Sequence, residues 1–157
     1  MSAIINKQQR IRQVENETPT AFLATLTDHA HHLGANQNIA FDNIITNVGD
    51  AYNSHVGALI APVSGIYVLS TTLLSYPGSD THFAVLHNGS MVAKIYQLIN
   101  GDDYESSSVT VVLQLSKGDD VSVANRDADK SVNGYHYSSF SGFLLQEIYD
   151  DTSVVGK

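Results

Sequence analysis

The stretch that decides the fold is Ala61-Pro62-Val63-Ser64-Gly65-Ile66-Tyr67-Val68-Leu69-Ser70, or APVSGIYVLS. It carries no charge, and the four residues after Gly65 are all apolar. Neighbouring side chains of a strand point to opposite faces of its sheet, so such a run is typical of a strand that is covered on both faces. The sequence therefore predicts a central strand over residues 66–74, with Gly65 at a bulge or at a close approach of two backbones.

Strand patterns separated by turn signals extend outward from this stretch. Apolar residues recur at every second position of the segment 109–115, the period of a half-buried strand. Segments 83–87 and 91–96 flank Asn88-Gly89, a pair that favours a tight hairpin turn. No segment shows a sustained helical period. We count about ten strands, which predicts an all-β fold, either a two-sheet sandwich or a jelly roll.

Length and composition fit one folded domain. The chain has 157 residues, 43% of them hydrophobic and 15% charged, within the usual size of a single domain. We expect an N-terminal arm or stalk remnant over residues 1–19, a globular domain over 20–149 and a C-terminal tail over 150–157. No stretch of the sequence has the pattern of a membrane span, and we expect a signal peptide to be absent or already removed.

The arm carries a short heptad-like spacing. Ile4, Ile11 and Val14 lie seven and three residues apart. One and a half heptads are too few for a stable coiled coil, so the stump of an oligomerising stalk and a frayed arm both remain open.

The charge balance narrows the classes of partner. Sixteen acidic and eight basic residues give a formal net charge of −8. Such a surface repels phosphate backbones, so we expect neither nucleic acid nor insertion into an anionic membrane. Cations, cationic peptides and neutral ligands such as sugars remain open. The chain has no cysteine, which excludes thiol catalysis, cysteine-type zinc sites and disulfides.

At specific positions the chain resembles the complement C1q globular-domain family, within the C1q and tumour-necrosis-factor superfamily. The resemblance runs from about residue 20 to residue 148. The matching segments are Ala21-Phe22-Leu23-Ala24, Ile39-Ala40-Phe41-Asp42, Asn47-Val48-Gly49, Tyr52-Asn53, Gly57, Ala61 to Ser70, Asn88-Gly89, Leu113 to Leu115, Gly118-Asp119 before Val121, and Phe140-Ser141-Gly142-Phe143-Leu144-Leu145.

This resemblance implies a ten-stranded jelly-roll sandwich that assembles as a homotrimer. It also implies a secreted, non-enzymatic recognition module. Two features depart from complement C1q itself, because no collagen repeat precedes the domain and cysteine is missing. The chain is similar instead to the short, stalkless C1q-domain proteins of invertebrates, which act as lectin-like pattern-recognition molecules.

An acidic loop is the candidate calcium site. Asp102, Asp103 and Glu105 precede the 109–115 strand, where calcium-binding members of the family carry acidic ligands near the trimer axis. Carboxylate oxygens are the ligands that calcium prefers. Gln97 stands at about the position of the other family ligand and is not a carboxylate. The alternative is a solvated acidic turn.

A second loop is the candidate ligand site. Arg126, Asp127 and Asp129 lead into Tyr135, His136 and Tyr137, so both charge signs and aromatic rings occur together. Such a mixture suits polar, ring-shaped ligands, and loops carry variable polar groups more readily than strands do. The alternative is an ordinary solvated turn.

His29, His31 and His32 form a local cluster. In an extended segment His29 and His31 would point the same way, which could support a metal site or a ligand contact. A solvated loop is the alternative. No nucleophile elbow, phosphate loop or dinucleotide fingerprint occurs, and we expect no enzymatic activity.

The leading hypothesis is a secreted trimeric protein of innate immunity that recognises surface glycans or other microbial patterns. Three weak copies on one face would give avidity well beyond the affinity of one site. Two alternatives stay open: a C1q-type ligand of a receptor protein, and an extracellular matrix protein associated with calcium or mineral.

Overall fold

The computed structural model describes residues 19–77, 80–98 and 101–149. The domain boundaries at residues 1–19 and 150–157 remain predictions, because residues 1–18 and 150–157 lie outside the described part. The described residues form twelve strands: β1 (Ala21–Thr25), β2 (Ala30–Leu33), β3 (Asn43–Val48), β4 (Tyr52–Asn53), β5 (Ala58–Ile60), β6 (Gly65–Leu74), β7 (Thr81–His87), β8 (Ser90–Gln97), β9 (Ser106–Leu115), β10 (Asp120–Asn125), β11 (Lys130–Val132) and β12 (Ser139–Glu147).

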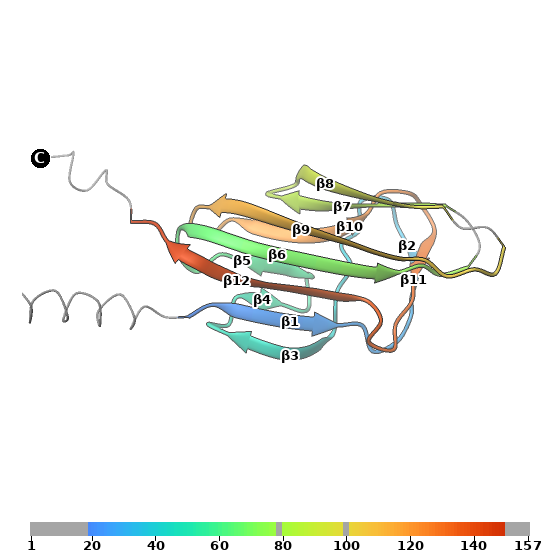
Figure 1. The fold of residues 1–157 in the computed structure, drawn as a ribbon, viewed down its shortest axis with the longest axis horizontal. Helices are drawn as coiled ribbons and strands as arrows, with labels where there is room; N and C mark the ends of the chain where they lie inside the picture. The colour runs from blue at the N-terminus through green and yellow to red at the C-terminus, as the bar shows by residue number, and fades with distance from the viewer. Residues whose placement is uncertain (1–18, 78–79, 99–100, 150–157) are drawn as a thin grey trace, which may run out of the picture.

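Ten of these strands build two antiparallel five-stranded sheets, which confirms the predicted all-β jelly roll. One sheet has the order β3-β1-β12-β6-β9, and the other has the order β4-β5-β10-β7-β8. The two sheets lie face to face in Figure 1. The remaining strands, β2 and β11, pair with each other at one end of the sandwich.

The core lies between the two sheets and follows the alternation of the sequence. Along β6 every second residue is buried, beginning with Gly65 and continuing through Tyr67 and Leu69. Tyr67 and Phe140 are among the largest fully buried side chains. The strand is central as predicted, since it lies between β12 and β9. Its second face, however, is only half-buried in a single chain, which corrects the expectation that both faces are covered.

Gly65 lies at a close approach, one of the two predicted roles, and Gly142 lies at a second one. A Cβ at Gly65 would lie 2.5 Å from the carbonyl oxygen of Gln146. A Cβ at Gly142 would lie 3.0 Å from both the ring of Phe22 and the carbonyl oxygen of Val68. At Gly65 the two strands β6 and β12 can pair this closely only because a side chain is missing, and at Gly142 an added Cβ would require its neighbours to shift slightly.

The predicted hairpin at Asn88-Gly89 is also confirmed. It joins β7 to β8, and both turn residues have positive φ, 49° for Asn88 and 81° for Gly89. This combination characterises the type I′ turn, whose twist matches that of the flanking strands.

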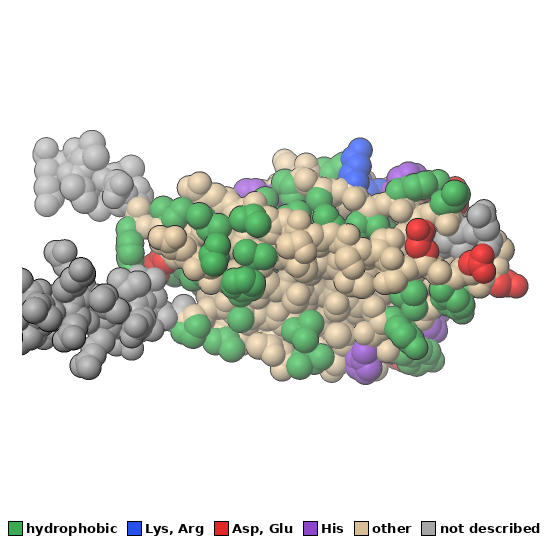
Figure 2. All heavy atoms as spheres, in the orientation of Figure 1, with side chains coloured by type: hydrophobic (Ala, Val, Ile, Leu, Met, Phe, Trp, Pro, Cys, Tyr) green, Lys and Arg blue, Asp and Glu red, His purple; other side chains and the backbone are tan. Residues whose placement is uncertain are grey.

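The outer face of the first sheet carries an apolar row across all five strands. The strand register places Val48 beside Ala21, Ala21 beside Phe143, Phe143 beside Val68 and Val68 beside Val112. Phe143 is 46% exposed and Val112 64% exposed. Figure 2 shows hydrophobic side chains gathered on this face at the end where β6 begins. Further along β6, polar pairs replace the apolar residues on this face; one such pair is Ser70 and Thr110, whose hydroxyl oxygens lie 2.7 Å apart.

Candidate functional site

A cavity of about 550 Å³ opens at the end of the sandwich where β6 ends and β12 begins. The chain enters β1 and leaves β12 at the opposite end (Figure 1). The cavity is lined by four tyrosines and four other residues, all of which except Leu74 of β6 come from connecting segments: His29, Leu74, Tyr76, Pro77, Tyr104, Asn133, Tyr135 and Tyr137. Its volume lies within the usual range of small-molecule sites, and no charged side chain is among its described lining residues.

A strained turn presents two of the tyrosines. Tyr135 and His136 have φ values of 52° and 65°, and the N–H of Tyr137 donates to the carbonyl oxygen of Gly134 (3.1 Å). These features describe a type I′ turn, which normally favours glycine or asparagine at both central positions. Left-handed backbone costs an ordinary residue about 1–2 kcal/mol. Such strain persists where the surroundings enforce it, and it concentrates at functional sites.

Three contacts hold this turn against the end of β1. The N–H groups of Tyr135 and His136 donate to the carbonyl oxygens of Thr27 and Leu26, both at 2.9 Å. The His136 Nδ1 atom lies 2.7 Å from the Thr25 hydroxyl oxygen. His136 is thus an anchor of the turn at the edge of β1 and does not line the cavity.

His29 lines the cavity next to this turn. Its Nδ1 atom accepts a hydrogen bond from the backbone N–H of Gly134 (2.9 Å). An acceptor Nδ1 requires the neutral tautomer that carries its proton on Nε2, so His29 can offer that N–H as a donor. The His29 ring also stands edge-on to Tyr135 and Tyr76, with ring centroids 4.7 and 5.3 Å away.

The residues of the predicted ligand loop lie at several places. Arg126 and Asp127 line a smaller cavity of about 280 Å³ beside β7 and β8. Asp129 lines another cavity, and Tyr137 lines the tyrosine cavity. The structure therefore divides this set, and the ligand role of each residue remains a prediction.

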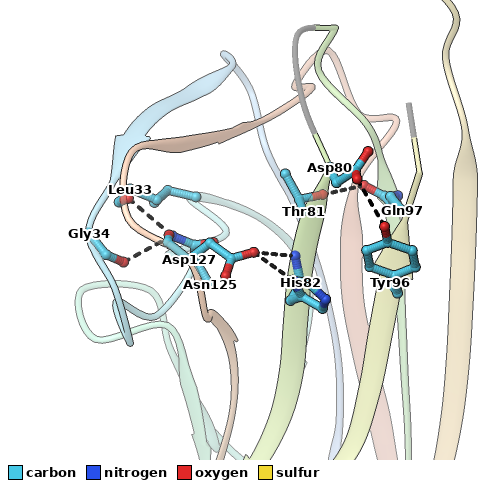
Figure 3. Close-up of polar contacts among 9 residues, drawn as sticks. All are labelled: Leu33, Gly34, Asp80, Thr81, His82, Tyr96, Gln97, Asn125 and Asp127. Carbon is cyan, nitrogen blue, oxygen red and sulfur yellow. Dashed lines mark hydrogen bonds and ion pairs between the residues drawn. The ribbon is translucent and has the colours of Figure 1, made fainter. Parts of the chain in front are cut away.

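Asp127 is held by β7. Its Oδ2 atom accepts hydrogen bonds from the backbone N–H of His82 (3.0 Å) and from His82 Nδ1 (2.7 Å), as Figure 3 shows. The hydrogen bond from the His82 ring is the main reason that the pKa of Asp127 is lowered. The preceding Asn125 is buried, and its amide donates to the carbonyl oxygens of Leu33 and Gly34, both at 3.0 Å (Figure 3). These contacts tie the start of the loop to β7 and β2.

The acidic loop lies at the same end as the tyrosine cavity, since Tyr104 belongs to both. Asp102, Asp103 and Glu105 are exposed. Glu105 is fixed through its backbone, which exchanges hydrogen bonds with Ser75 (2.7 and 2.8 Å). Gln97 is buried and donates to the carbonyl oxygens of Leu73 and Glu105. Within the described part of one chain, no three His, Cys, Asp or Glu side chains come close enough to hold a metal ion. A calcium site at this loop remains a prediction.

The tyrosine cavity brings together residues that no sequence motif groups. Tyr76, Tyr104 and Asn133 come from three different connections of the sandwich. A signal was present, because four of the eight tyrosines fall between strands, where no core needs them. Aromatic rings outside the strand pattern therefore indicate a surface that binds a ligand or a partner.

Comparison with known proteins gives one consistent result. The family model of the C1q domain matches residues 21–145. Complement C1q tumor necrosis factor-related protein 3 of Mus musculus is 32% identical over 137 residues, which are 85% of this chain and 54% of that protein. Heavy metal-binding protein HIP of Mytilus edulis is 32% identical over 127 residues, 80% of this chain and 60% of that protein. The chain thus spans little more than half the length of these relatives.

A solved structure supports the same fold. The globular domain of zebrafish complement 1qA superposes with a TM-score of 0.70 at 17% identity, covering 82% of this chain and 99% of that one. None of the described segments forms a helix that could span a lipid bilayer.

Proposed function

The chain belongs to the C1q domain family, and from this membership we propose that it is a secreted, homotrimeric, non-enzymatic protein that recognises glycans or other microbial surface patterns. The observation that carries the proposal is the tyrosine cavity at the end of the sandwich away from the start of β1 and the end of β12. A binding face at that end stays open while the other end is attached to whatever precedes or follows the domain.

The lining of the cavity suits a neutral sugar. A pyranose ring has C–H faces that pack on aromatic rings and a rim of hydroxyl groups that need partners. Tyrosines supply both the ring and a hydroxyl group, and His29 supplies a donor at Nε2. A cavity with a few convergent polar groups among apolar walls is the usual form of a small-ligand site.

The apolar row on the outer face of the first sheet supports the homotrimer. Val48, Phe143 and Val112 are each more than 40% exposed in the single chain, and the row crosses the whole sheet. Contiguous exposed apolar surface of this kind marks a contact between proteins. In a trimer the copies would cover one another's rows, and three cavities would act together.

A glycan array tests the proposal. We expect the trimer to bind a subset of surface glycans, and Tyr137→Ala to weaken that binding at least tenfold. Tyr96→Ala is the matched control, because Tyr96 is an exposed tyrosine of β8 that does not line the cavity. Binding that Tyr137→Ala leaves unchanged would contradict this site. A blank array alongside tight binding to a receptor protein would favour the receptor-ligand alternative.

A second candidate function is the binding of heavy metals, which one observation favours. His32 Nδ1 lies 2.6 Å from the Asp129 carboxylate, so Nδ1 is the donor, and in the neutral form of the ring Nε2 carries a lone pair that can bind a metal. Carboxylates orient metal-binding histidines in this way. The ring of His31 lies 6.1 Å from that of His32, and the mussel relative is named for heavy metals.

Calorimetry with cadmium and zinc tests this second candidate. We expect His32→Ala to weaken metal binding, whereas His55→Ala, which removes an exposed histidine near β4, should not. Equal binding by both variants would reject the His32 site.

A further inference from the structure

A second cavity adjoins the tyrosine cavity. It measures about 280 Å³ and shares Tyr76 and Pro77 with its larger neighbour. The other lining residues come from β2, β7, β11 and the turn before β11: His31, His32, Thr81, Asp129, Lys130 and Ser131. The second cavity is thus richer in hydrogen-bonding and charged groups than the first.

Three rings separate the two cavities. His29 lines the first cavity and His31 the second, and their ring centroids lie 5.7 Å apart. Tyr76 belongs to both, with its centroid 5.3 Å from His29 and 4.9 Å from His31. All three contacts are edge-to-face, the favoured geometry of paired aromatic rings. The partition is therefore a packed ridge of side chains with binding surface on either side.

Backbone strain is concentrated around the same two cavities. Seven described residues other than glycine have positive φ, and four of them are His32, Asp129, Tyr135 and His136. His32 and Asp129 line the second cavity and bind each other. Tyr135 lines the first, and His136 anchors its turn. The hairpin at Asn88 shows that strained positions can serve folding alone, and His32 and Asp129 also flank the irregular pairing of β2 with β11. All four strained residues nevertheless lie in or beside the walls of the two cavities.

We propose that the two cavities form one bipartite site whose ligand is an oligosaccharide of at least two units. One unit packs on Tyr135 and Tyr137. The chain of sugars then crosses the ridge at Tyr76, and the next unit hydrogen-bonds to the imidazole of His31 and to the hydroxyl group of Ser131. The inference rests on the proposed glycan recognition and makes it more specific, because a single sugar would fill only one side of the ridge.

The test compares free sugars of increasing length. Calorimetry on the full chain would use mannose, galactose and N-acetylglucosamine, each as the monosaccharide and as its linked disaccharide and trisaccharide. For the sugar that binds, we expect the disaccharide to bind at least tenfold more tightly than the monosaccharide. His31→Ala should remove this gain, so that the mono- and the disaccharide bind that variant with equal affinity. Tyr137→Ala should weaken every member of the series. His55→Ala should change nothing.

The outcomes separate the two proposals. If mono- and disaccharide bind equally, or if His31→Ala keeps the tenfold gain, the bipartite site is wrong while glycan recognition stands. If no sugar binds the wild-type protein in this series or on the array, glycan recognition itself fails. Urea unfolding of each variant checks that a loss of binding is not a loss of fold.

Discussion

The backbone N–H of Gly134 donates a hydrogen bond to Nδ1 of His29 over 2.9 Å, although the two residues lie 105 positions apart in the chain. The contact exists because Gly134 has no side chain: a Cβ there would lie 2.2 Å from the carbonyl carbon and oxygen of Asp28. The loops before β2 and β12 can approach this closely at residue 134 only because it is a glycine. Their contact sets both the tautomer of His29 and the position of Tyr135.

Gly134→Ala should therefore destabilise the fold and open the tyrosine cavity. The added methyl group meets backbone and not a flexible side chain, so one loop must move away. We expect a loss of about 2–4 kcal/mol in the free energy of unfolding, measured in urea. Gly34→Ala is the control, because the nearest atom to its Cβ is the end of the Gln37 side chain at 3.4 Å. Equal stability of the two variants would show that the two loops can move apart at little cost in free energy.

The sequence predicts the parts of this fold that depend on local pattern. The alternation in 109–115, the run after Gly65 and the turn at Asn88-Gly89 each specify a strand or a hairpin within about ten residues. The order in which the strands are connected cannot be predicted from periodicity alone. It follows from the resemblance to the C1q family.

The tyrosine cavity could not be predicted in the same way. Its walls come from His29, Tyr76, Tyr104 and Tyr135, which meet only after the loops take their conformations. One of these loops contains two consecutive left-handed residues that are neither glycine nor asparagine, which no turn rule anticipates. For the same reason Asp129 and His32, assigned from the sequence to separate sites, prove to be partners.

Tyr135→Asn should separate stability from binding. Asparagine tolerates left-handed backbone better than tyrosine, so the change relieves part of the strain. It also removes the contact with the His29 ring, worth about 0.5–1.5 kcal/mol. We expect the free energy of unfolding to stay within about 1 kcal/mol of the wild type while glycan binding weakens.

Tyr137→Asn is the matched comparison for Tyr135→Asn. Both side chains are 62% exposed and line the same cavity, but Tyr137 does not have positive φ. It should lose binding without any compensating relief of strain. A loss of more than about 2 kcal/mol in Tyr135→Asn alone would instead give Tyr135 a structural role.

Phe143→Lys should dissociate the trimer. The lysine would place a charge at the centre of the apolar row, and an unpaired charge buried between subunits is strongly unfavourable. Light scattering at micromolar concentration should show three times 17.0 kDa for the wild type and one chain for the variant. Val56→Lys, an equally exposed apolar position in the turn between β4 and β5, should remain trimeric. We also expect a chain without residues 1–18 to remain trimeric. A monomeric wild type would reject the assembly.

Asp119 should make stability depend on pH in the acidic range. Hydrogen bonds from Asn88, His87 and the backbone N–H of Ser116 lower its pKa from 3.8 to about 2. Because the folded state binds the proton less tightly than the unfolded state, the stabilisation is complete above pH 3.8 and is lost as the pH falls toward 2. We expect Asp119→Asn to cost about 1–2 kcal/mol near neutral pH, and the difference from wild type to vanish near pH 2. Urea unfolding at several pH values measures it, with the exposed Asp103→Asn as control. A difference that did not change with pH would contradict a role of the charge.

Calcium should raise the melting temperature of the trimer if the acidic loop binds it. In one chain the exposed side chains of Asp102, Asp103 and Glu105 hold no metal cluster with other described residues, but three copies would bring up to nine carboxylates to one end of the assembly. Their mutual repulsion favours a cation, and hard oxygen ligands favour calcium. At a concentration a hundred times the Kd, the linkage would stabilise the folded trimer by about 2.7 kcal/mol.

Melting curves in chelator and in millimolar calcium measure the shift, and Asp103→Asn with Glu105→Gln should abolish it. Asp50→Asn, in the turn between β3 and β4, should leave it intact. An unchanged midpoint in the wild type would reject the site. A rise that persists in the double variant would place the ion outside this loop. Asp127 and Asp129 are then poor candidates, because their carboxylates already pair with His82 and His32.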